Sequence, residues 1–348
     1  MTEPSAGNDE SDRRARLRAV KLHALVRDHL AASDGGVPDL TVGSFAPGAA
    51  LTAGDAAWVL IDPASSDGRG LGPALVWASR RGVTSLHVVA EQGAGVVARR
   101  AAEFTVPTTV WNAEGRSLRP ADTQPIGPPA EASADHLRFV PDIEAAGAVP
   151  LIEFGVVAGE VRGLEVCRVV DADGANGIEA RLDVGVGVHD RDAFAIMHAG
   201  VPIADALANV VASVTAVRDV SVPAHPLNRL APERFLRWRL EQEPWLVGMA
   251  SVRPAQPPVP RINLKDRAAC IARGARIDGS EVVIVCSVGV DLDVIPYAAD
   301  ARLAAESDPG ADAFDAIVVT PPRDLMPVTE ELAKLLRRAL SLVPLPVG

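Results

Sequence analysis

The sequence predicts an α/β protein of two domains, on the evidence of three observations. Val- and Ile-rich segments alternate with segments of helical period, as in a sheet covered by helices. A chain of 348 residues is longer than one hydrophobic core usually serves. Segment 122–135, DTQPIGPPAEASAD, is rich in Pro and Ala and is predicted to be a linker. We expect a mostly parallel sheet in the N-terminal domain, and an α+β middle portion and a mixed sheet with helices in the second domain.

The expected N-terminal domain spans 13–121 and follows a disordered tail, 1–12, which is polar. The loop 67–72, DGRGLG, joins a strand to a helix, where backbone N–H groups could meet a phosphate. It is not a complete G-x-G-x-x-G, so a Gly-rich turn that lets the helix pack closely is the alternative. The expected elements are a helix over 13–32, a linker or surface crossing over 33–54, strands at 57–62, 85–91 and 108–114, helices near 71–81 and 94–104, and a returning edge segment at 116–121.

The second domain, 136–348, begins with a β-rich part and ends with two strand–helix units in series. A Pro-rich segment, 251–266, is expected to cross the surface in an extended form. The expected elements are a helix near 138–147, strands within 150–170 and 180–188, helices at 205–217 and from Pro232 to about 243, strands at 281–288 and 315–320, and helices near 292–305 and 328–342.

Composition limits the functional classes. The formal net charge of −11 makes the protein acidic and argues against non-specific coating of nucleic acid, which needs a basic surface. The N-terminus lacks an apolar signal-peptide core and no apolar run reaches about 18 residues, so we expect a soluble, cytoplasmic protein without a membrane span. The three cysteines, Cys167, Cys270 and Cys286, are expected to be buried thiols.

One candidate polar site follows the apolar strand 281–288. Ligands of open α/β sheets bind beyond the carboxyl ends of the strands, and two aspartates stand there. The alternative is that Asp291 caps the next helix. If the site is functional, Arg323, at the end of the neighbouring strand, should reach the same crevice. The candidate residues are Asp291, Asp293, Asp300, Arg302, Arg323 and Asp324.

A second cluster, His189, Asp190 and Arg191, follows the strand 180–188. A histidine beside a carboxylate could serve acid–base catalysis or bind a metal. Neighbouring residues of a strand point to opposite faces, so a polar loop is the alternative.

Two further candidate sets lie in the middle of the chain. Glu165 and Asp183 could hold a divalent metal through carboxylate oxygens if their strands pair; otherwise they are solvated carboxylates. Strand alternation places Glu165 and Arg168 on opposite faces. Arg229, Arg234 and Arg237 could bind phosphate, but the glutamates among them favour an ion-paired helix.

The order helix–strand–strand–strand–helix in this part resembles restriction-endonuclease-like cores, which carry a carboxylate followed by a Glu-x-Lys-type element. Here Asp183-Val184-Gly185 has Gly at the position of the lysine, so the resemblance implies a degenerate copy.

The sequence therefore favours two functional hypotheses and leaves a third open, a small-molecule transferase that uses the 289–302 site. The first is a binding or scaffolding protein without a working catalytic motif, whose partner is another protein or a second copy of itself. The second is a phosphate-directed protein: a metal-assisted phosphodiesterase, or a degenerate relative that binds nucleic acid or nucleotide.

Overall fold

The computed structural model describes residues 6–32, 38–46, 48–62, 68–174, 177–187, 202–222, 225–260, 268–308, 310 and 313–347. The chain forms two compact units. Unit 1 contains residues 1–126, 291–300 and 326–340, and unit 2 contains 127–290, 301–325 and 341–348. The first division, between Ile126 and Gly127, falls inside the segment predicted as a linker. Unit 1 is discontinuous in sequence, whereas the N-terminal domain expected from the sequence is continuous over 13–121.

Unit 1 has a six-stranded mixed sheet in the order β1-β2-β3-β4-β5-β6. Its strands are β1 (Leu40–Gly43), β2 (Gly48–Ala53), β3 (Ala56–Ile61), β4 (Ser85–Ala90), β5 (Thr108–Glu114) and β6 (Ser117–Pro120). Only β3, β4 and β5 run parallel, so the mostly parallel sheet was predicted correctly only in part. Strands β1 and β2 occupy the segment predicted as a surface crossing. Their sequences are rich in Ala, Gly and Thr, and antiparallel pairing of β1 with β2 and of β2 with β3 orders them.

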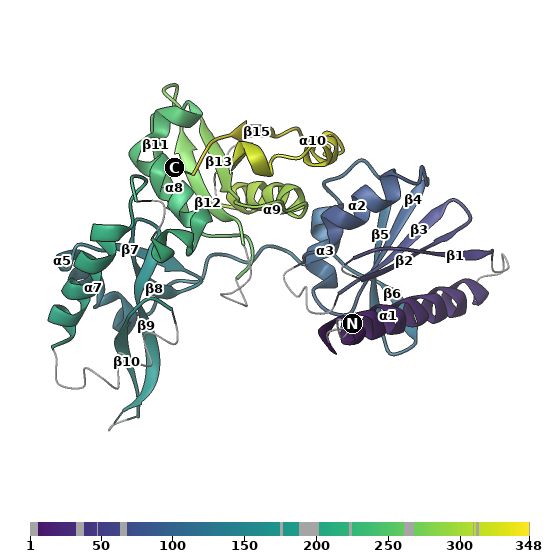
Figure 1. The fold of residues 1–348 in the computed structure, drawn as a ribbon, viewed down its shortest axis with the longest axis horizontal. Coiled ribbons are helices and arrows are strands. Elements are labelled where there is room, and N and C mark those ends of the chain that lie inside the picture. The colour runs from purple at the N-terminus through teal and green to yellow at the C-terminus, as the bar shows by residue number, and fades with distance from the viewer. Residues whose placement is uncertain are drawn as a thin grey trace, which may run out of the picture. The chain divides into compact units, whose positions relative to one another are not determined.

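Helices cover both faces of this sheet (Figure 1). The apolar side of α1 (Ala6–Ala31) packs on β2 and β3 through Leu22, Leu25 and Val26. This helix begins at Ala6, inside the segment predicted as a disordered tail. Helices α2 (Leu71–Ser79) and α3 (Ala94–Ala101) follow β3 and β4, as the alternating pattern predicted. None of the helices in the described part of the chain is long and apolar enough to cross a bilayer.

The first sheet of unit 2 is antiparallel, in the order β10-β9-β8-β7. Its core contains Val157, Val166 and Leu182 from the sheet, with Ile143 and Leu207 from the helices. The elements are α4 (Ala134–Leu137), α5 (Val140–Ala145), β7 (Val149–Glu153), β8 (Val156–Val161), β9 (Leu164–Gly174), β10 (Gly177–Val184) and α7 (Ile203–Val217).

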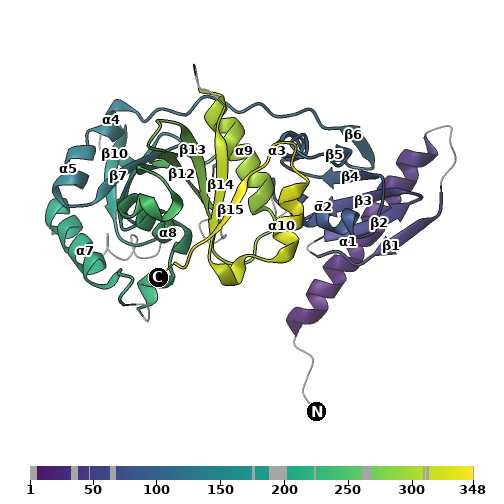
Figure 2. The same ribbon diagram turned by 90° about the horizontal axis from the view of Figure 1, so that it is seen from above.

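The second sheet of unit 2 is mixed, in the order β11-β12-β13-β14-β15, with β13, β14 and β15 parallel (Figure 2). Helix α8 (Pro232–Gln242) packs on it through Leu236 and Leu240. The other elements are η1 (Pro226–Arg229), η2 (Pro244–Val247), β11 (Ser251–Ala255), β12 (Cys270–Ala275), β13 (Glu281–Cys286), β14 (Asp315–Thr320), η3 (Pro322–Asp324) and β15 (Ser341–Pro344).

Two helices follow the parallel strands of this sheet in sequence: α9 (Val294–Glu306) and α10 (Pro327–Lys334). The prediction of a helix over 328–342 was wrong at its end. The helix stops at Lys334, and the last part of that segment belongs to β15, which pairs with β14.

Candidate functional site

The three aspartates that follow β13, at positions 291, 293 and 300, belong to unit 1 and form their contacts within it. The carboxylate of Asp293 accepts hydrogen bonds from the backbone N–H of Gly70 (2.8 Å) and of Gly72 (2.9 Å), at the start of α2. The position predicted for a phosphate is therefore occupied by a carboxylate of the same chain. A Cβ on Gly72 would lie 2.3 Å from the carbonyl oxygen of Leu292, so glycine permits this approach. Burial, with the charge of Asp291, raises the pKa of Asp293.

Asp291 and Asp300 also have structural partners. Asp291 accepts from Nη2 of Arg69 (2.8 Å) and from the backbone N–H of Asp293 (3.0 Å), the residue before α9 begins. Buried Asp300 accepts from Nε of Arg99 (2.7 Å) and from Nε of Arg100 (2.9 Å). These bonds join residue 300 of α9 to α3 within unit 1.

The remaining members of this candidate set differ in exposure and in partners. Arg323 has 80 % of its side chain exposed, and Asp324 accepts from the backbone N–H of Gly289 (2.8 Å). Arg302 is buried. The other predicted cluster, His189, Asp190 and Arg191, lies outside the described residues.

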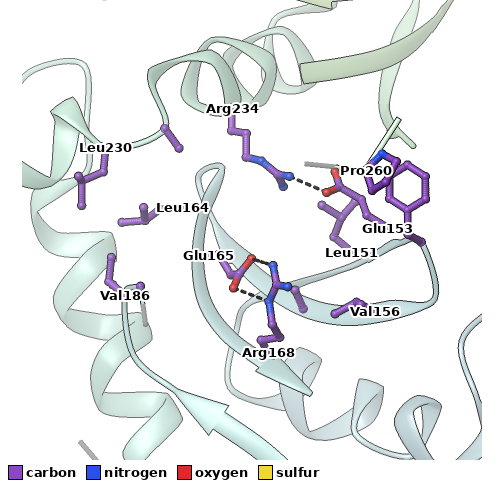
Figure 3. Close-up of a pocket in the computed structure, with 14 residues that line it drawn as sticks. Leu151, Glu153, Val156, Leu164, Glu165, Arg168, Val186, Leu230, Arg234 and Pro260 are labelled. Carbon is purple, nitrogen blue, oxygen red and sulfur yellow. Dashed lines mark hydrogen bonds and ion pairs between the residues drawn. The ribbon is translucent and has the colours of Figure 1, made fainter. Parts of the chain in front are cut away.

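A different site emerges in unit 2, where a cavity of about 540 Å³ opens between the antiparallel sheet and the start of α8 (Figure 3). Its walls are mainly apolar, and four charged side chains stand among them. The described lining residues are Leu151, Glu153, Phe154, Val156, Ala158, Leu164, Glu165, Arg168, Val186, Gly187, Leu230, Ala231, Arg234 and Pro260.

A β-bulge places Glu165 and Arg168 side by side in this cavity. Gly159 is paired with Cys167 but Glu160 with Glu165, so the register shifts and Val166 is the extra residue. The two side chains consequently share a face, and Arg168 donates to Glu165 from Nε (2.9 Å) and Nη2 (2.8 Å). The prediction that Glu165 and Arg168 lie on opposite faces was wrong, because the extra residue resets the alternation.

A chain of ion pairs fixes α8 to the sheet beside the cavity. Arg234 donates to Glu153 (2.6 Å) and to Glu160, and Arg237 donates to Glu160 and to Glu241 (2.8 Å). Burial works to lower the pKa of Arg234 and Arg237, but the charge of Glu160 contributes most to raising both above the usual value. The ion-paired helix is the alternative that the structure confirms. Arg229, the third phosphate candidate, is exposed.

The backbone around the cavity is strained. Phe154, Arg162 and Ala231 have positive φ angles of 52°, 49° and 42°, a region that side-chain-bearing residues rarely adopt. Buried Arg218 holds the Ala231 turn by donating to the carbonyl oxygens of Leu230 (2.9 Å) and Ala231 (3.2 Å). Burial lowers the pKa of Arg218 to about 10. Strain of this kind persists only where the surrounding structure enforces it, and it often marks binding sites.

The structure gives each predicted metal ligand its own arginine. Glu165 pairs with Arg168, and Asp183 pairs with Arg181 at 2.7 Å. Asp183 stands opposite Arg168 in the strand register, so both carboxylates lie on one face of the sheet. Within the described ranges, no group of three or more His, Cys, Asp or Glu side chains is arranged to hold a metal ion.

Comparison with known proteins does not add a function to this geometry. No protein-family model, curated protein or solved structure matches the chain.

Proposed function

We propose that the chain is a binding protein that holds a small amphipathic ligand in the cavity of unit 2. The observation that carries the proposal is the register shift at Val166, which turns the pair Glu165 and Arg168 into a cavity whose walls are mainly apolar. Ligand pockets typically combine apolar walls with a few placed polar groups, and volumes of about 300–1,000 Å³ are usual.

The charges in the wall suggest the polar part of the ligand. Arg168 uses Nε and Nη2 on Glu165, and among the described residues its Nη1 has no acceptor. A guanidinium nitrogen of this kind favours an acceptor oxygen, such as that of a carboxylate or sulfonate. The ligand class is therefore an apolar body with one acidic or carbonyl head, positioned so that the head meets Arg168.

A fluorescent naphthalene sulfonate, 8-anilinonaphthalene-1-sulfonate, has this chemistry and serves as the probe. We expect saturable binding to the full chain with a rise in fluorescence. Leu151→Trp should abolish it, because Leu151 lines the cavity. Ile152→Trp is the matched control, since Ile152 is exposed, precedes the same turn and does not line the cavity. Equal binding by the two variants would refute the proposed site.

The phosphate-directed alternative gives a different result in a melting experiment. Inorganic phosphate, a nucleotide or Mg²⁺ should raise the melting temperature if that alternative holds. Its support is reduced by the ion pairs that Arg234 and Arg237 form with glutamates. A protein partner or a second copy of the chain stays a prediction from the sequence.

A further inference from the structure

Two of the three cysteines lie opposite each other in the second sheet of unit 2. Cys270 begins β12, Cys286 ends β13, and the antiparallel register pairs them directly. Directly opposite residues have Cα atoms about 4.5–5.5 Å apart and side chains on the same face. A disulfide spans Cα separations of about 4.4–6.8 Å, so the backbone already meets the main requirement for one.

The two thiols also contact each other and differ in exposure. Cys286 is fully buried, and a hydrogen bond with Cys270 together with burial raises the pKa of its thiol well above the usual value. Cys270 is 6 % exposed, and its Sγ donates to the carbonyl oxygen of Glu233 at 3.1 Å. Cys270 is therefore the less buried residue of the pair, and Cys286 is the one whose thiol pKa is raised.

A cation stands beside the pair. The guanidinium of Arg237 interacts electrostatically with both cysteines. Its Nη1 is buried and has no hydrogen-bond partner in the part of the chain that the structure describes.

We propose that Cys270 and Cys286 form a redox pair that closes into a cross-strand disulfide under mild peroxide oxidation. The Cys270 thiolate attacks hydrogen peroxide, gains a sulfenic hydroxyl and releases hydroxide, which takes up a proton to give water. The Cys286 sulfur then attacks the sulfenic sulfur as its thiol proton leaves with the hydroxyl as a second water. Two thiols and one peroxide give one disulfide and two waters.

The disulfide changes the contacts of the cysteines with the start of α8. Both cysteines share an apolar core with Leu236 and Leu240 of that helix. Closing the disulfide removes the thiol that donates to Glu233, one residue before the cavity residue Arg234. Oxidation is therefore expected to weaken ligand binding in the cavity, a consequence that rests on the proposed function.

The test treats the full chain with hydrogen peroxide, alkylates the remaining thiols under denaturing conditions and maps the peptides by mass. We expect a peptide pair joined through Cys270 and Cys286, lighter by two hydrogens than the reduced pair, with Cys167 alkylated. Cys167→Ala should keep the cross-link and Cys270→Ala should lose it. Alkylation of both Cys270 and Cys286 after treatment, or over-oxidation of Cys270 without a cross-link, would overturn the redox pair.

Titration with the naphthalene sulfonate before and after oxidation tests the coupling. A several-fold loss of affinity is expected on oxidation of the wild type, and no change for Cys270→Ala. A cross-link that forms with unchanged affinity overturns the coupling. A cross-link that forms in a chain that binds no probe in either state refutes the proposed function and leaves the redox pair standing.

Discussion

Glu160 is the residue on which the site in unit 2 depends most for its stability. It is 4 % exposed and accepts from Arg234 and Arg237, of which Arg237 is 1 % exposed. Glu160→Gln keeps the shape of the side chain but removes its charge and turns an amide donor toward two guanidinium groups. Removing one partner of a buried ion pair costs about 3–5 kcal/mol, because the remaining charge stays buried without compensation.

The assay is calorimetric melting of the full chain, with Asp183→Asn as the matched control. Asp183 pairs with Arg181 on the same sheet, but 58 % of the Arg181 side chain is exposed, so the loss should be about 0.2–1 kcal/mol. For a unit of this size, the Glu160 variant should melt roughly 10 °C lower and the control within about 4 °C of the wild type. The double variant Glu160→Met with Arg237→Met should recover part of the loss. If Glu160→Gln costs no more than Asp183→Asn, the buried network does not stabilise the unit and the reasoning fails.

Three other substitutions test single features. Asp293→Ala should lower the stability of unit 1, measured by calorimetry, by at least about 2 kcal/mol, because two backbone N–H groups lose their acceptor. Asp324→Ala leaves only one backbone N–H group, that of Gly289, without its acceptor. Burial, with a smaller contribution from His29, lowers the pKa of His87 to about 4. The free energy of unfolding of the wild type should therefore fall by at most about 3 kcal/mol as the pH falls from about 6.5 to 4. In denaturant titrations, His87→Gln should flatten this pH dependence, and an unchanged slope would contradict the prediction. Gly163→Ala should destabilise the protein more than Gly248→Ala does. Both glycines have φ near +72°, but only a Cβ at position 163 would meet a backbone atom of α8, the carbonyl oxygen of Arg234, at 2.2 Å. Equal losses of stability in denaturant titrations would rule out this close contact.

Elements with a continuous apolar run were predictable from the sequence. The segments 281–286 and 315–320 are buried strands, and strands covered on both faces have near-continuous runs of Val and Ile rather than polar alternation. Strands β1, β2 and β15 were missed because their short sequences carry little strand preference, and pairing with a neighbour determines them. His87 lies in the apolar strand β4, where its ring stacks on Trp58 with the ring centroids 4.1 Å apart and accepts from Nε1 of Trp111.

The site was predictable only in fragments. Glu165 was identified as a candidate, but its partner Arg168 was assigned to the wrong face, because nothing in the local pattern marks Val166 as an extra residue. Glu160 was missed although a signal existed: a charged residue inside the apolar run VVAGEV must find a buried partner. The acceptor role of Asp293 was also hidden, because its donors lie more than 200 positions earlier in the chain.

The discontinuity of unit 1 has a consequence for synthesis on the ribosome. When residue 126 has been made, the amides at the start of α2 and the arginines of α3 still lack Asp293 and Asp300. At about 5–20 residues per second, those two aspartates follow on the order of ten seconds or more later. Unit 1 begins translation first but is completed only after most of unit 2 has emerged. Until then, the N–H groups at the start of α2 and the arginines of α3 lack their carboxylate acceptors, and a chaperone can recognise such an incomplete unit.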